Sequence, residues 1–62
     1  MKINFKTFLD NTQCANDYEA DSLEWAALIY RTFRACGYAV IPYDELGREY
    51  WLNDQGELVP KT

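Results

Sequence analysis

The stretch from Asp17 to Gly37 constrains the fold of this chain more than any other, because its pattern alone predicts a helix. At about 100° per residue, its apolar side chains gather on one side and cover roughly half of the helix circumference. An arc that wide needs cover from a sheet and from a second short element. The residues of this arc are Tyr18, Leu23, Trp25, Ala26, Ala27, Ile29, Tyr30, Phe33 and Cys36, and of these we expect Trp25, Tyr30 and Phe33 to lie in the core. Leu28 is the one apolar member of the opposite face.

Both ends of this predicted helix carry sequence signals. At its start, Asn16 with Glu19 fits a capping box, in which side chains satisfy the first free backbone N–H groups. Asp21 with Glu24 offers a second start a few residues later. Acids at this end also suit the positive end of the helix dipole. At the other end, Gly37 can adopt the left-handed conformation that terminates helices, so we expect the helix to stop there.

The segment before the helix is ambiguous. Phe5, Phe8 and Leu9 have helical spacing, whereas Ile3 and Phe5 alone could begin a strand. We expect a short helix, roughly Asn4 to Asn11, that lays its apolar side chains on the long helix.

After Gly37 the residue types become those of strands. Residues 38–43 and 48–53 are rich in β-branched and aromatic side chains, and residues 57–60 form a shorter third run. The sequence Asn-Asp-Gln-Gly at 53–56 predicts a turn that ends on a left-handed glycine. Connections this short make neighbouring strands antiparallel.

The predicted architecture is therefore a single small α+β domain over residues 1–62. It has a short N-terminal helix, one long helix, and a three-stranded antiparallel sheet packed on the long helix.

The net charge of −4, from ten acids against six bases, argues against direct binding of nucleic acid, which needs a basic patch. It favours a basic protein partner, or simply solubility. Aromatic residues make up 16% of the chain, so some rings are expected at a contact surface. No stretch fits a signal peptide or a membrane span, which predicts a cytoplasmic location without membrane contact.

The two cysteines, Cys14 and Cys36, are expected as reduced thiols because nothing in the sequence directs export. A disulfide between them stays an alternative, if the N-terminal segment folds back over the end of the helix.

Catalysis and metal binding have few suitable residues. There is no histidine, and the only serine, Ser22, has no base near it in the sequence. Two cysteines without histidine cannot complete a tetrahedral zinc site, and the turn acids Asp54 and Glu57 lack the ligand density of a calcium loop. We expect no enzyme activity, metal or cofactor. A winged-helix DNA reader is also disfavoured, because acids occupy the exposed face of the helix.

The acids themselves are the main candidates for a binding surface. If several share one side, they would imitate the charge spacing along nucleic acid and steer a basic partner. Strand aromatics could supply anchors beside them. In the alternative interpretation, the charges form an ordinary solvated face and the rings are core. The candidate partner-binding residues are Asp17, Asp21, Glu24, Asp44, Glu45, Glu49, Asp54, Glu57, Trp51 and Tyr43.

A very short, acidic and aromatic-rich chain without catalytic side chains resembles small phage-encoded inhibitors, including anti-CRISPR proteins and other nucleic-acid mimics. The resemblance implies a non-catalytic inhibitor that occupies the basic nucleic-acid-binding surface of a host protein in the host cytoplasm. Two other hypotheses stay open. One is an antitoxin- or immunity-type partner that binds through aromatic contacts, and the other is a self-associating accessory protein. The chain would accordingly be a monomer or a homodimer.

Overall fold

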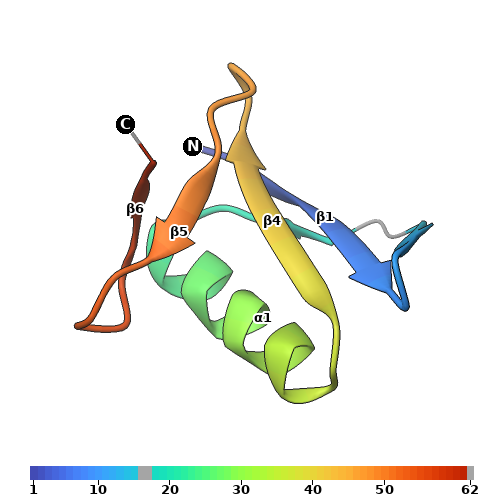
Figure 1. Ribbon diagram of the computed structural model, residues 1–62. Coiled ribbons are helices and arrows are strands. Elements are labelled where there is room, and N and C mark those ends of the chain that lie inside the picture. Colours follow the sequence, from blue (N-terminus) through green and yellow to red (C-terminus); the bar gives the residue numbers. More distant parts are fainter. Residues whose placement is uncertain (16–17, 62) are drawn as a thin grey trace.

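The computed structural model describes residues 1–15 and 18–61, and Figure 1 shows a single helix lying against strands from both ends of the chain. The predicted fold, with a short N-terminal helix, one long helix and a three-stranded sheet, is wrong. The described residues instead form one short helix and two sheets, of four and two strands. The elements are β1 (Ile3–Leu9), β2 (Thr12–Cys14), β3 (Glu19–Ala20), α1 (Leu23–Ala35), β4 (Ala39–Asp44), β5 (Tyr50–Leu52) and β6 (Leu58–Pro60).

Strand β1 replaces the N-terminal helix that was predicted from Asn4 to Asn11. Ile3, Phe5 and Thr7 are buried while the side chains between them are more exposed, which is the period of two of a strand. The chain then reverses through Asp10 and Asn11, whose positive φ angles of 51° and 65° suit a tight hairpin. Pairing on both edges of β1 therefore outweighs the helical spacing of its larger apolar residues.

Strand β1 is the centre of the larger sheet. On one edge it pairs antiparallel with β4, from Ile3 to Phe8. On its other edge it pairs first with β3 and then with β2. Strands β5 and β6 form an antiparallel hairpin, which a single bridge between Tyr43 and Glu49 joins to β4.

The last three strands were predicted in nearly the right places, but their arrangement was not. The runs over residues 38–43, 48–53 and 57–60 correspond to β4, β5 and β6. However, β4 belongs to the sheet built on β1, so these strands do not form a separate sheet packed on the helix.

The helix begins at Leu23 and is shorter than predicted. Glu19 and Ala20 form β3 instead of a first helical turn, because their backbone groups pair with β1. Ser22 caps α1, and its Oγ accepts a hydrogen bond of 3.1 Å from the Trp25 N–H. The proposed cap at Asn16 and the candidate site residue Asp17 lie outside the described residues.

The helix ends where the sequence predicts. Gly37 has a φ of 95°, and its N–H donates to the Arg34 carbonyl. The Tyr38 N–H donates to the Phe33 carbonyl, which completes a Schellman motif. This glycine turns the chain from α1 directly into β4.

The core lies between α1 and one face of the strands. Ala26 and Ala27 are buried, and their small size lets the helix approach the sheet closely. Tyr30 and Phe33 are only partly buried beside this cluster. The expectation that Trp25 is a core residue is wrong, since its side chain is 55% exposed. The remaining buried apolar residues are Ile3, Phe5, Ala20, Val40, Tyr50 and Leu58.

Within the described part of the chain, no helix has the length and apolarity that crossing a membrane requires. Cys14 and Cys36 are free thiols, so the alternative of a disulfide between them does not hold.

Candidate functional site

Asp44, one of the candidate acids, is buried and organises the connection between β4 and β5. Its Oδ1 accepts hydrogen bonds of 2.9 Å from the backbone N–H groups of Leu46 and Arg48. Its Oδ2 accepts 2.9 Å from the Arg48 guanidinium and 3.1 Å from the Tyr50 hydroxyl. Burial raises the pKa of Asp44, but these donors outweigh that effect and hold it below the usual value. This carboxylate holds a turn together and is not presented to a partner.

Two more of the candidate acids accept hydrogen bonds from lysine residues. Glu49 forms an ion pair of 2.9 Å with Lys61, and this hydrogen bond, with the charges of Lys61 and Lys6, lowers the pKa of Glu49. Glu45 accepts a hydrogen bond of 3.3 Å from the Lys2 backbone N–H. The charge available for steering is therefore smaller than the sequence suggests.

The other described candidate acids lie at the start of α1 and around the β5–β6 turn. Asp21, Glu24, Asp54 and Glu57 are exposed, and none of them belongs to an ion pair found among residues 1–15 and 18–61. Glu24 and Glu57 line one groove of about 420 Å³, although they are 33 positions apart in the sequence. Arg31 lines the same groove and donates to the Gly56 carbonyl over 3.4 Å. The acids thus converge in part, around a cation.

A second groove, on the other flank of α1, is almost wholly apolar. We call it the apolar groove; it measures about 380 Å³ and is lined by Tyr18, Trp25, Leu28, Ile29, Thr32, Phe33, Cys36 and Tyr38. Phe33 forms its floor, with edge-on contacts to Tyr18 at 5.2 Å and to Tyr38 at 5.4 Å between ring centroids. Trp25, at 55%, and Leu28, at 43%, are strongly exposed along it.

This groove was not predicted from the sequence, because the apolar arc of the helix was assigned to the core. The useful signal was the width of that arc, since Ala26 and Ala27 are the only buried residues of α1. Trp25, Ile29 and Phe33 continue the arc past the edge of the sheet. A helix that is apolar beyond its buried side is typical of a contact surface.

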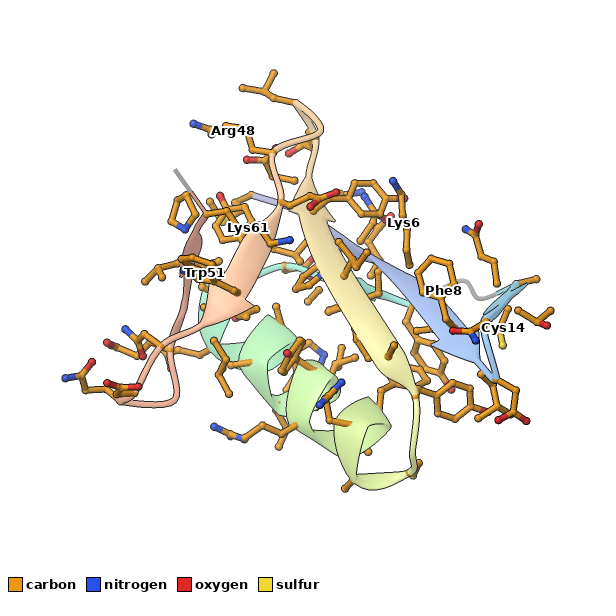
Figure 2. The ribbon with its side chains drawn as sticks, in the orientation of Figure 1. Lys6, Phe8, Cys14, Arg48, Trp51 and Lys61 are labelled. Carbon is orange, nitrogen blue, oxygen red and sulfur yellow. The ribbon has the colours of Figure 1, made fainter. Side chains whose placement is uncertain are left out.

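The candidate aromatic residues Trp51 and Tyr43 lie on the face of the strands opposite α1. We call this the open sheet face. The pairing of β1 with β4 and of β5 with β6 determines which side chains lie on it. Trp51 is 53% exposed, and Tyr43 is partly exposed. In Figure 2, Trp51, Lys61, Lys6 and Phe8 follow one another across the strands, with α1 below them. Lys6 and Phe8 were not named as candidates, because β1 was predicted to be a helix.

The described residues contain no group of three or more His, Cys, Asp or Glu side chains that could hold a metal ion. No protein-family model, curated protein or solved structure matches this chain. The function of this chain must therefore be inferred from the geometry of these surfaces.

Proposed function

We propose that this chain is a small non-catalytic inhibitor that binds one basic protein through the apolar groove and the acids beside it. The observation that supports this proposal is the apolar groove itself, which leaves Trp25 and Leu28 exposed together on a chain of 62 residues. Water contact with such surface is unfavourable by about 25 cal/mol per Å², and burial under a partner removes it.

The groove has the features of a binding hot spot. Trp25 is a large, rigid anchor at the rim, and Phe33 and Ile29 provide a packed apolar floor. Leu28 and Cys36 lie along the same groove on the outer side of α1. An apolar side chain of the partner, rather than an extended charged segment, fits this lining.

Charge indicates what surrounds that apolar side chain on the partner. Helix α1 contributes Trp25 and Leu28 to the apolar groove. It also contributes Glu24 to the groove on its other flank, described above, so a partner lying across α1 would contact both grooves. Asp21 and Glu24 stand at the helix start and favour a positive rim on the partner. Such charges chiefly raise the association rate and the specificity.

The inhibitor acts by occupying a surface, with no chemical step, and it needs no metal or cofactor. Free Cys14 and Cys36 suit a reducing compartment, which supports action in the cytoplasm of a host cell. The target surface would be one that a basic protein normally uses for nucleic acid or for its own partner.

The test exploits two tryptophans of nearly equal exposure. Immobilised wild-type chain, Trp25→Ala, Leu28→Asp and the control Trp51→Ala are incubated with nuclease-treated host cytosol, and captured proteins are identified by mass spectrometry. The proposal expects one protein to be retained by wild type and Trp51→Ala and lost with the two groove variants. With that protein purified, Trp25→Ala should weaken Kd about tenfold or more. Equal capture by all four chains would contradict the proposal.

A nucleic-acid mimic that depends on charge alone is the second candidate, because Glu24 and Glu57 share one groove. It predicts that reversing Asp21, Glu24 and Glu57 to lysine abolishes capture while Trp25→Ala does not. It also predicts binding that weakens steeply with salt. Groove binding predicts the opposite ranking of the two variants.

Self-association is the remaining alternative, and the same proteins test it. Light scattering of the isolated chain should give the monomer mass of 7.3 kDa under the proposal. A mass near twice that value, reverting to monomer with Leu28→Asp, would assign the apolar groove to a homodimer instead.

A further inference from the structure

We propose that the open sheet face is a separate site, which binds single-stranded nucleic acid by stacking bases on its rings and placing phosphates beside its lysines. This inference does not depend on the apolar groove, which lies on the other side of the molecule along α1. Three observations carry it: uncovered rings, cations set between them, and segregation of charge.

The rings lie on neighbouring strands and on the same side of them. Phe8 is on β1, Tyr43 on β4 and Trp51 on β5. Each alternates with a buried neighbour, as Tyr43 does with Asp44 and Trp51 with Tyr50. Among the described residues, no element covers this side, since α1 packs on the opposite face. Exposed aromatic rings on a sheet are the platform on which unpaired bases stack.

The cations of this face lie next to the rings. The Lys6 Nζ is 5.3 Å from the centroid of the Tyr43 ring. Lys61 is held beside β5 by its backbone hydrogen bond to the Glu49 carbonyl and by its ion pair with the Glu49 carboxylate. Figure 2 shows Lys61 and Lys6 between Trp51 and Phe8. A strand whose bases stack on the rings would bring its phosphates within reach of both lysines.

The net charge of −4 predicts no contact with nucleic acid, but that total conceals how the charges are distributed. Four of the exposed acids, Asp21, Glu24, Asp54 and Glu57, belong to the α1 start and the β5–β6 turn, and Asp10 and Glu45 lie in the turns that follow β1 and β4. On the open sheet face, Glu49 lies beside Lys6 and Lys61, and Glu19, which pairs with Asn4 of β1, forms an ion pair of 3.1 Å with Lys2. Lys2 and Lys61 are therefore paired with acids, and Lys6 provides the excess positive charge that is complementary to phosphate.

A single strand fits this face better than a duplex. In a duplex the base faces are already stacked and only the edges and phosphates are accessible. The open sheet face has few cations for a phosphate-only contact, so its rings can contribute only when bases are unpaired. The proposal therefore predicts preference for single strands and tolerance of base sequence.

The experiment measures fluorescence anisotropy of labelled oligo(dT) and oligo(U) of about twelve nucleotides, with a duplex of equal length for comparison. Wild-type chain should bind a single strand saturably at about 50 mM salt and bind the duplex at least about fivefold more weakly. Comparing the two homopolymers distinguishes DNA from RNA as the natural ligand.

Matched variants locate the site. Trp51→Ala should weaken Kd by about fivefold or more, whereas Trp25→Ala, which removes an equally exposed ring from the other side, should leave Kd unchanged. Lys6→Gln should lower the slope of log K against log salt by about 0.7. Glu49→Gln should strengthen binding, because it removes a carboxylate from the path of the phosphates and frees Lys61.

Several results would overturn the proposal. These are no saturable binding of either single strand at low salt, duplex bound as tightly as single strand, or equal losses with Trp51→Ala and Trp25→Ala. A dimer that Trp51→Ala dissociates would show that a second copy of the chain occupies this face. None of these results bears on the apolar groove, whose test uses nuclease-treated cytosol and the reverse pair of tryptophan variants.

Discussion

At the scale of the residue, Asp44 was expected on a binding surface, but its carboxylate is buried and accepts hydrogen bonds from within the chain. Asp44→Asn keeps the shape but presents an NH₂ group to donors from Arg48 or Tyr50. We expect a melting temperature lower by at least about 4 °C, measured by circular dichroism. Glu45→Gln changes an exposed neighbour and serves as the control. Equal melting temperatures for the two variants would contradict this role for Asp44.

The pKa of Asp44 also predicts how the stability of the chain changes at acidic pH. The pKa of Asp44 in the folded chain lies below its value in the unfolded chain, about 3.9. Its contribution to stability is therefore present above that pH and is lost as pH falls through the folded-state pKa. In urea titrations between about pH 6 and 2, the midpoint of wild type should fall more steeply than that of Asp44→Asn.

The Tyr50 hydroxyl predicts how the stability of the chain changes at alkaline pH. Burial, together with its hydrogen bond to Asp44, raises the pKa of the Tyr50 hydroxyl above its ordinary value of about 10. The folded chain holds this proton more tightly than the unfolded chain, so stability is complete below about pH 10 and falls as pH rises further. Tyr50→Phe should reduce that loss in urea titrations, whereas Tyr43→Phe, at a partly exposed ring, should retain it.

At the scale of the element, the start of α1 depends on one side chain. Ser22 satisfies the Trp25 N–H, and without its oxygen that donor loses its partner in the protein. Ser22→Ala should lower the free energy of unfolding by about 1 kcal/mol, measured by urea denaturation. Ser22→Asp keeps an acceptor and should preserve stability. If both variants unfold at the wild-type midpoint, the helix does not depend on this cap.

What the sequence could reveal at this scale was local. Gly37 stops the helix and the 53–56 turn forms as predicted, with Gly56 at a φ of 79°, because each signal lies within a few residues. Strand β1 was mispredicted because its identity depends on β4, whose residues lie more than thirty positions later. The helix start was misplaced for the same reason, since the pairing of Ala20 with Ile3 takes those residues into β3.

At the scale of the whole molecule, the sequence predicted which residue types could form a contact surface but not where the fold would gather them. Trp51 is exposed and Tyr43 is partly exposed, whereas Asp44 is internal and Trp25, assigned to the core, is at the surface. The net charge adds all charged residues together and says nothing of their positions. In the fold, Glu24 and Glu57 lie apart from the lysines of the open sheet face. Both proposed binding sites depend on that separation.

The whole molecule also depends on β1 as its central strand, and this leads to the last prediction. Ile3 is fully buried and pairs with both Ala20 and Asp44, so three strands meet at its side chain. A domain of 62 residues has a total stability of roughly 3–9 kcal/mol. Ile3→Ala should cost about 2–5 kcal/mol and leave much of the chain unfolded at 37 °C, as measured by circular dichroism.

Ile3→Val and Leu9→Ala are the reference variants for this prediction. Ile3→Val removes one methyl group and should cost about 0.5–1.5 kcal/mol, which leaves the chain folded. Leu9 is exposed at the end of β1, so Leu9→Ala should change stability by no more than about 0.5 kcal/mol. If β1 were instead a peripheral helix, Ile3 would precede it and both alanine variants would be mild. A folded Ile3→Ala chain with wild-type stability would therefore contradict the central position of β1, and with it the open sheet face.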